Sequence, residues 1–333
     1  MSEALSPFSP TLPTWQTVWD STSLGWYKMC PRLYKYQMID GWEPRHRGLH
    51  LMFGGLYAAA LERYAHAKAS GSSHDAATLR MVRWALENSG TRHHDPDCPA
   101  SAPPYDGTCT CGMNVFVPWS DPEHPDSNTK NRYTLIRSLV WNAEERLGSP
   151  FTTLILANGR PAVELSFKFE MYDIGGETVA LSGHMDEVVE AEGDLWVRDD
   201  KTTKNVLNAA YFQQYTPNNQ MSLYSVAGKV ILSRPVRGVL VKAAQIGVNF
   251  TRFRTGQVPR PQAVLDEWLR DTEFYIRQAR ANAEANHWPL NDKSCFLCSF
   301  KKICAVSPSH REAHLREDYV KRQWNPNQAR GDI

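Results

Sequence analysis

The amino-acid sequence predicts an α/β fold, and three stretches with different periodicities carry that prediction. Residues 49–69 repeat apolar side chains at helical spacing, whereas residues 163–171 alternate apolar and polar side chains with a period of two. Residues 236–246 are dense in β-branched and apolar side chains, which favours a buried strand. Helices and strands that alternate along one chain are typical of the α/β class.

Length and composition set the broad limits. A chain of 333 residues, 42% of them hydrophobic, suffices for one large domain or two ordinary ones. No apolar run reaches the ~18 residues that span a bilayer, and Met1–Ala4 lacks the layout of a signal peptide. We therefore expect a cytoplasmic (intracellular) protein with no membrane association. Its seven cysteines are then expected to be metal ligands or buried thiols rather than disulfides.

The net charge of +1 neither indicates nor excludes a nucleic-acid partner. Basic residues can still form a local phosphate-binding track in a chain with balanced charge.

The N-terminal part of the chain predicts a flexible arm followed by helices. Residues 1–13 are rich in Ser and Pro and are expected to form the arm. Hydroxyl side chains at residues 21–23 are expected to cap a short helix, and Pro31 suits the first turn of the next one. The helix over 49–69 is largely apolar, yet it contains Glu62. A carboxylate in such a helix needs a reason, because isolated charge in a core is costly.

Residues 92–130 interrupt this helical pattern as an insertion without obvious regular structure. We expect a helix on either side of it, one capped by Asp75 and one over residues 131–146. A loop of this length is uncommon unless it is functional or held by some other contact. Its candidate zinc ligands are Cys98, Cys109, Cys111 and His94. The alternative is a disordered loop whose cysteines bind nothing.

The segment after Pro161 predicts a three-stranded antiparallel meander. Turn residues at Gly175-Gly176 and Glu192-Gly193 separate three apolar stretches, of which 163–171 is the first. The run at 236–246 is expected to join the same sheet as a further strand.

Helical spacing returns in the C-terminal half of the chain. It predicts helices over 204–215 and 220–230 and a long helix from Pro261. We expect a single domain over residues 14–304, followed by a polar helix and tail over residues 305–333.

Two acidic motifs stand on the second and third strands of the expected meander. Gly183-His184-Met185-Asp186 lies on one strand, and Asp199-Asp200-Lys201-Thr202 ends the other. Mg²⁺ and Mn²⁺ prefer carboxylate and carbonyl oxygens, and such cations activate water and neutralise charge that develops on a phosphate. Asp186 and Asp199 are therefore candidate metal ligands, and Asp200 would contribute its main-chain carbonyl.

Four further side chains complete the candidate site. Lys201 lies two residues past Asp199 and so on the same face of the strand, where it can orient water and stabilise charge. Glu62 would complete or orient the metal shell. Gln220 and Tyr224 share one helix face because they are four residues apart. The alternatives are an Asp-X-Lys that occurs by chance on an exposed strand end and an ordinary amphipathic helix with a buried tyrosine.

In their order and spacing, these motifs resemble the RecB-like branch of the PD-(D/E)XK nuclease superfamily. The resemblance covers roughly residues 50–304 and implies a restriction-endonuclease-like core, in which a mixed central β-sheet is flanked by helices. It implies a divalent-metal nuclease with Asp186 and Asp199 as ligands, Lys201 as the catalytic lysine, and Gln220 and Tyr224 as residues that position DNA.

The first motif of that branch usually carries a glycine, a histidine four residues on and an acid four residues later. Gly54 and Glu62 fit this pattern, but Ala58 occupies the position of the histidine. His50, His66 and His184 are candidates to replace it, and the alternative is that each is an ordinary surface or packing histidine.

A second set of residues consists of four cysteines, Cys30, Cys295, Cys298 and Cys304. Four thiolates are the number that a [4Fe-4S] cluster takes. The arrangement is similar to that of the iron-sulfur members of the same branch, including CRISPR adaptation exonucleases and the AddB nuclease domain, in which the cluster joins the N- and C-terminal regions. The alternatives are a tetrahedral zinc site and buried cysteines without a metal.

The function expected from the motifs and the resemblance is a metal-dependent exonuclease that acts on single-stranded DNA or DNA ends. The competing hypothesis is a catalytically weak DNA-end-binding component of a recombination, repair or CRISPR-type complex, and Ala58 is its support. Recombination, repair or phage replication proteins are the expected partners.

Overall fold

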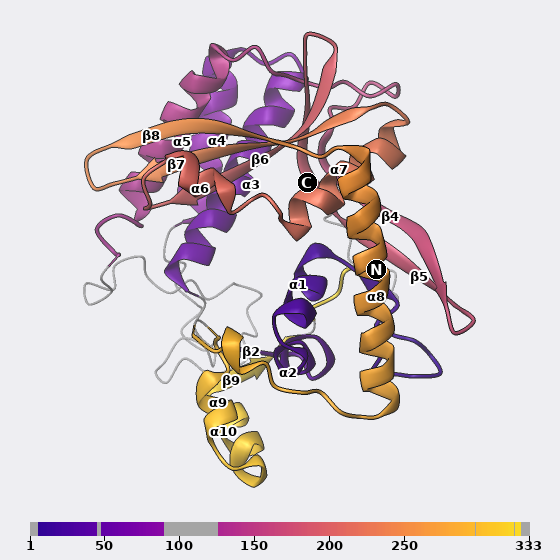
Figure 1. The fold of residues 1–333 in the computed structure, drawn as a ribbon. Coiled ribbons are helices and arrows are strands. Elements are labelled where there is room, and N and C mark those ends of the chain that lie inside the picture. Colours follow the sequence, from indigo (N-terminus) through magenta and orange to yellow (C-terminus); the bar gives the residue numbers. More distant parts are fainter. Residues whose placement is uncertain (1–5, 45–47, 90–125, 297, 323, 328–333) are drawn as a thin grey trace.

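A computed structural model describes residues 6–44, 48–89, 126–296, 298–322 and 324–327 of the chain. Its central feature is a seven-stranded mixed β-sheet with the order β1-β5-β6-β7-β8, in which β3 and β4 also pair with β5. The strands are β1 (Val18–Trp19), β3 (Thr152–Thr153), β4 (Val163–Ile174), β5 (Glu177–Ala191), β6 (Asp194–Thr203), β7 (Val236–Ile246) and β8 (Thr251–Pro259). Helices cover both faces of this sheet (Figure 1). The predicted α/β class and the mixed sheet flanked by helices are therefore confirmed.

The predicted meander is present as β4, β5 and β6, which pair in antiparallel fashion. Gly175 and Gly176 both adopt positive φ angles in the turn between β4 and β5, a conformation that favours glycine. β7 then pairs with β6 in parallel, because a helix carries the chain back across the sheet before β7 begins. The predicted strand over 236–246 is thus confirmed, with the same bounds.

The edge strand β8 has no counterpart in the sequence prediction. It pairs with β7, but most of its side chains are exposed or half-buried, and Arg252 and Arg254 are among them. The apolar alternation that marks a half-buried strand is therefore missing, as is common for edge strands that carry charge.

Three helices lie on one face of the sheet. They are α3 (Leu49–Ala69), α4 (His74–Asn88) and α5 (Arg132–Leu147). Phe53, Tyr57 and Leu61 of α3 belong to the hydrophobic core beneath them. α3 and α5 match their predicted ranges, but the cap of α4 is Ser73 rather than Asp75, because the Ser73 hydroxyl accepts the Ala76 N–H. Asp75 lies instead in the first turn of α4.

The opposite face carries α1 (Ser21–Met29), α7 (Asn219–Leu232) and α8 (Gln262–Glu284). The helix predicted over 204–215 is only the short α6 (Ala209–Gln213). Asn208 is extended and caps α6, so the chain becomes helical later than predicted. Pro217, soon after α6 ends, lacks the N–H that a continuing helix needs.

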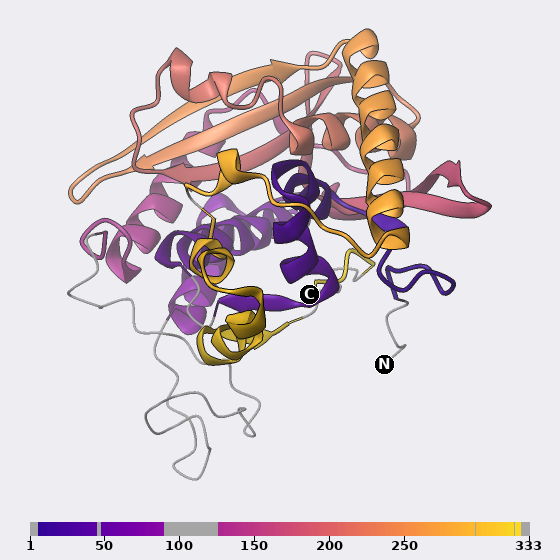
Figure 2. The ribbon, with the colours of Figure 1, turned by 60° about the horizontal axis from the view of Figure 1, so that its bottom comes forward.

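The N- and C-terminal regions of the chain pack side by side. α2 (Pro31–Tyr34) leads through a π-helical turn at Lys35–Ile39 into β2 (Trp42–Pro44), which pairs antiparallel with β9 (Tyr319–Lys321). The C-terminal side also contains 3-10 turns at Asp292–Ser294 and Pro308–His310 and the helices α9 (Lys301–Ala305) and α10 (Arg311–Asp318). Figure 2 shows α9 and α10 beside the N-terminal elements.

A third hydrophobic cluster lies between these regions and includes Leu33, Tyr36, Phe300 and Leu315. Residues 305–333, expected to be a polar helix and tail, thus supply a strand and core residues to the region around α2.

Among the residues that the structure describes, no helix combines the length and apolar character that crossing a membrane requires.

Candidate active site

Asp186 and Asp199 stand where β5 and β6 separate. The antiparallel pairing of the two strands ends at Glu187 and Arg198. Asp186 comes just before Glu187 and Asp199 just after Arg198, so both acids lie one residue beyond the last pair. Their carboxyl groups interact, since each affects the pKa of the other. Burial, and after it the charge of Asp199, raises the pKa of Asp186 well above its ordinary value of 3.8. Burial likewise raises the pKa of Asp199, although Lys201 opposes the shift. Two buried acids that resist ionisation together favour a cation between them.

Lys201 contacts Asp199 directly, as their shared strand face predicts. Its Nζ donates to Asp199 Oδ1 at 2.9 Å and lies 2.8 Å from Oδ2. Burial alone would lower the pKa of Lys201, but the Asp199 and Asp186 carboxylates outweigh it and raise that pKa. The lysine is therefore held in its charged form beside the two acids.

Gln220 and Tyr224 extend this chain of contacts onto α7. The Lys201 ammonium donates to Gln220 Oε1 at 3.1 Å, and Gln220 Nε2 donates to the Tyr224 hydroxyl at 2.9 Å. The second of these bonds confirms the predicted shared helix face. Gln220 contacts the lysine directly, and Tyr224 is connected to it through Gln220.

Asp199 Oδ2 meets one test for a metal ligand. Asp199 is fully buried, and Oδ2 lies outside hydrogen-bonding geometry toward Lys201, with no other hydrogen-bond partner among the described residues. A buried carboxylate oxygen without a hydrogen bond is costly, and a divalent cation would satisfy it. Across the described residues, however, no three or more His, Cys, Asp or Glu side chains are arranged so that they could hold a metal ion.

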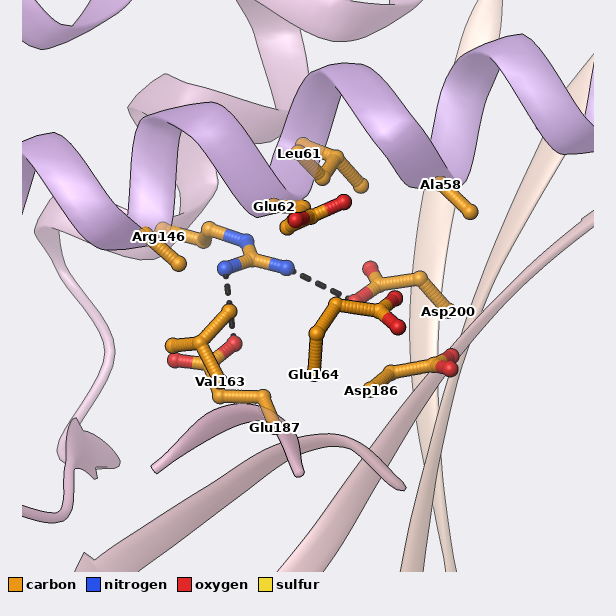
Figure 3. A pocket seen from close by; sticks show the side chains of 10 residues that line it. Ala58, Leu61, Glu62, Arg146, Val163, Glu164, Asp186, Glu187 and Asp200 are labelled. Carbon is orange, nitrogen blue, oxygen red and sulfur yellow. Dashed lines mark hydrogen bonds and ion pairs between the residues drawn. The ribbon is translucent and has the colours of Figure 1, made fainter. Parts of the chain in front are cut away.

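A pocket adjoins these acids on the side of α3, and we call it the catalytic pocket. Figure 3 shows the carboxylates of Glu62, Glu164, Asp186 and Asp200 facing its interior. Its lining residues are Ala58, Leu61, Glu62, Ala65, Arg146, Val163, Glu164, Asp186, Glu187 and Asp200. The structure thus brings Glu62 to Asp186, as predicted. Asp200 turns its carboxylate into this pocket, whereas sequence reasoning considered only its carbonyl.

Ala58 also lines the catalytic pocket, at the position where the family pattern has a histidine. None of the candidate replacements lines it. His50 lies 2.9 Å from Asp126, His66 lies 3.9 Å from Glu62, and His184 contacts the Ser166 hydroxyl.

Glu164 was not found from the sequence. It is the second residue of β4, with a left-handed φ of 49°. Its charge adds to those that raise the pKa of Asp186. A single glutamate between Val163 and Leu165 reads as an ordinary outward-facing strand residue, so no local signal distinguishes it.

A buried network in the wall of the pocket holds the residues that follow Asp186 and Asp199. Arg146 of α5 donates to Glu187 Oε2 at 3.0 Å and to Asp200 Oδ2 at 2.7 Å (Figure 3). Arg198 and Thr153 also donate to Glu187. The side chains of Arg146, Glu187 and Asp200 are no more than 7% exposed. Sequence reasoning missed Arg146, because an arginine near the end of a helix is usually a surface residue.

The structure brings the four predicted cluster cysteines together, and we call the space between them the cysteine cavity. Cys30, Cys295, Cys298 and Cys304 all line it, and none forms a disulfide. Burial raises the pKa of the Cys298 and Cys304 thiols. The other predicted ligands, Cys98, Cys109, Cys111 and His94, lie outside the described residues.

Known proteins resemble this chain at several levels. It is 26% identical over 194 residues to the Gene 69 protein of Mycobacterium phage D29, a match that covers 56% of this chain and 64% of that protein. The chain thus spans less than two thirds of the phage protein. A solved structure named "Putative exonuclease", from Eubacterium rectale, superposes with a TM-score of 0.47 at 10% identity, covering 87% of this chain and 89% of the other.

The family model described as PD-(D/E)XK nuclease superfamily matches residues 21–305. That range contains β4 to β8, Asp186, Asp199, Lys201 and the four cysteines of the cysteine cavity. The chain therefore belongs to the PD-(D/E)XK nuclease superfamily.

Proposed function

We propose that the protein is a divalent-metal-dependent exonuclease that hydrolyses phosphodiester bonds of single-stranded DNA or DNA ends. One observation carries the proposal: Lys201 is held in its charged form against Asp199, next to Asp186, where two strands of the family fold separate. Two carboxylates and a lysine are the groups that metal-assisted phosphodiester hydrolysis needs.

Asp186, Asp199 and the main-chain carbonyl of Asp200 would hold Mg²⁺ or Mn²⁺, and Glu62 would complete or orient the shell. When bound, the cation supplies a deprotonated water and neutralises charge on the phosphate. Asp199 Oδ2, which accepts no hydrogen bond within the described residues, and the raised pKa of Asp186 support this ligand set.

Lys201 would stabilise the charge that develops on the phosphate and orient the attacking water. Asp199 and Gln220 both accept hydrogen bonds from the lysine, and Tyr224 accepts one from Gln220. We infer that this pair positions DNA through Lys201: the side chains that hold the ammonium also set where a phosphate can approach it.

The test is Lys201→Ala, with Lys204→Ala as its matched control. Lys204 lies just past the end of β6, is 58% exposed and pairs with Asp126, away from the catalytic acids. We expect Lys201→Ala to abolish Mg²⁺- or Mn²⁺-dependent cleavage of linear DNA while circular dichroism shows an unchanged fold, and Lys204→Ala to cleave. Full cleavage by Lys201→Ala would contradict the proposal.

Circular single-stranded DNA distinguishes an exonuclease from an endonuclease, since only an end-dependent enzyme leaves it intact. Ala58 favours a second candidate function, a DNA-end-binding protein with weak chemistry, because the pocket lacks the imidazole that the family pattern places there. Tight binding of DNA ends by the wild-type protein without cleavage in any divalent metal would favour that function.

We also propose that the cysteine cavity holds a [4Fe-4S] cluster that joins the N- and C-terminal regions. Its four cysteines come from the entry to α2 and from residues 295–304, and all four line one space, which supports their binding to one cluster. Iron content and the visible absorption spectrum of anaerobically purified protein test it. Cys304→Ser should lose iron and colour, whereas Cys109→Ser should retain both.

Two results would indicate zinc instead. Colourless protein with zinc in place of iron would favour a zinc site in the cysteine cavity. Zinc that is bound by the wild-type protein and lost in Cys109→Ser would indicate a second zinc site, in the 92–130 insertion.

A further inference from the structure

A second cavity, about 340 Å³ in volume, lies between α3 and α4. We call it the α3–α4 cavity. Its volume falls in the range of about 300–1,000 Å³ that is typical of ligand pockets. Glu62 lines both this cavity and the catalytic pocket, so the two spaces share a wall. A nucleic-acid strand with one phosphate among the catalytic acids would therefore have its next nucleotide within reach of this cavity.

The other walls of the α3–α4 cavity are predominantly basic. Arg63 and His66 come from α3 and Arg80 from α4. The one acid, Glu62, has Arg63 Nη1 at 3.8 Å and His66 Nε2 at 3.9 Å, so its charge is balanced within the wall. This cavity therefore differs in charge from the catalytic pocket beside it, and it suits an anion rather than a cation.

A flat stacking surface forms one side of the cavity. The Arg63 guanidinium lies over the Trp84 ring, 4.0 Å from its centroid, and Nη1 donates to the Ala59 carbonyl oxygen at 2.8 Å. These contacts hold the guanidinium over the ring and leave it donors beyond the one that Ala59 uses. Arginine and tryptophan are the side chains on which unpaired bases stack in proteins that bind single strands.

We propose that the α3–α4 cavity is a nucleotide subsite, in which Arg63, His66 and Arg80 bind a phosphate and the Arg63–Trp84 pair stacks a base of the strand being cleaved. The proposal rests on the proposed function, since it assigns a path to the DNA strand next to the scissile bond. The phosphate can be an internal phosphodiester or the terminal phosphate of a DNA end, and the two share the same recognition chemistry.

Binding is measured by fluorescence anisotropy of a single-stranded oligonucleotide, in the Lys201→Ala background so that the strand stays intact. Arg80→Ala is compared with Arg83→Ala. Both arginines are exposed on α4, but only Arg80 lines the cavity. We expect Arg80→Ala to weaken the Kd about tenfold and to reduce the slope of log K against log salt by about 0.7, the loss of one phosphate contact. Arg83→Ala should leave both unchanged.

Trp84 tests the stacking part of the subsite. Trp84→Leu should weaken binding of the oligonucleotide by about tenfold, and Trp84→Phe should restore most of it, because phenylalanine retains a ring. An abasic strand should bind wild type and Trp84→Leu equally. Oligonucleotides with and without a terminal phosphate identify the source of the anion: an effect of Arg80→Ala confined to phosphorylated ends indicates a terminal phosphate, and an equal effect indicates an internal one.

Equal affinities of Arg80→Ala and Arg83→Ala, with wild-type protein that cleaves DNA, would overturn the subsite and leave the proposed function intact. Failure of the proposed function looks different, because the wild-type protein would then not cleave linear DNA, whether or not it binds the oligonucleotide.

Discussion

Arg146→Gln should destabilise the protein strongly, because one buried guanidinium holds two buried carboxylates. Arg146 pairs with Glu187 at 3.0 Å and with Asp200 at 2.7 Å. These two acids directly follow Asp186 and Asp199 in the sequence, so Arg146 of α5 connects both catalytic strands. Glutamine at this position retains hydrogen-bonding capacity but removes the charge from both pairs.

The ion pairs of Glu187 set the size of the stability loss in Arg146→Gln. Burial alone would raise its pKa, but Arg198 and Arg146 outweigh burial and lower that pKa from 4.5 to about 2. This difference corresponds to about 3 kcal/mol of stability at neutral pH, which the two arginines share. Asp200 loses its only ion pair among the described residues. Since removing one partner of a buried pair costs about 3–5 kcal/mol, we expect a loss in that range at pH 7.

The pH dependence of this loss follows from the direction of the shift. Because the pKa of Glu187 is lower in the folded state, its stabilising contribution is complete above pH 4.5 and is lost as the pH falls toward 2. Without Arg146 the buried carboxylates protonate more readily, which removes part of the cost of burying them. Urea denaturation at pH 7 and pH 4 should therefore show a smaller gap between wild type and Arg146→Gln at pH 4.

Two further variants separate the contributions of Glu187 and Asp200. Arg198→Gln removes a cation from Glu187 but leaves Asp200 paired, so it should cost less than Arg146→Gln. Adding Asp200→Asn to Arg146→Gln should recover stability, because asparagine keeps the main-chain carbonyl and removes the uncompensated charge. A loss of less than about 1 kcal/mol in the free energy of unfolding of Arg146→Gln at pH 7 would contradict this role of Arg146. So would a double variant that is no more stable than Arg146→Gln alone.

Two other substitutions test separate parts of the structure. Ala58→His places an imidazole in the catalytic pocket. Because imidazole prefers transition metals, the variant should lower the Mn²⁺ concentration for half-maximal cleavage more than it lowers the Mg²⁺ concentration. Ala59→His is the control, and the same metal dependence in both variants would contradict this expectation. Lys130→Met should stabilise the protein by about 2 kcal/mol at pH 7. Burial lowers the pKa of Lys130 from 10.5 to about 8, so the charged lysine destabilises the folded state, and the favourable contact of its ammonium with the Phe53 ring offsets part of that cost. The lysine loses its charge in the folded state first, so the stability of the wild-type protein rises as the pH passes from 8 to 10.5. Urea denaturation should therefore show the difference in free energy of unfolding between wild type and Lys130→Met shrinking over this range. A difference that stays constant would contradict the role of the buried charge.

Local patterns were enough to predict the parts of the fold that depend on local geometry. The alternation before Gly175 follows from the two-residue repeat of a strand with one face toward the core, and the apolar run of β7 from a strand that is buried almost throughout. The two-residue spacing of Asp199 and Lys201 fixes their common face. β1, β2 and β9 are two or three residues long and exist only through pairing with distant segments, so no window of sequence marks them.

The same distinction applies to the candidate site. Asp186, Lys201, Gln220 and Tyr224 belong to spaced motifs, which a sequence displays directly. Arg146 and the α3–α4 cavity depend on how helices dock on the sheet, which the sequence displays only as isolated charged residues.

The pairing of β2 with β9 has a consequence for how the protein is made. Trp42 pairs with Lys321, from opposite ends of the chain, and contacts with such long sequence separation form late because loop closure costs entropy. During synthesis, α2 and Cys30 leave the ribosome before β9, Phe300 and the other three cysteines exist. Leu33 and Tyr36 therefore stay uncovered until Phe300 and β9 have been synthesised. Completion of the cysteine cavity thus waits for Cys295, Cys298 and Cys304, and any cofactor it receives must be delivered after they have left the ribosome.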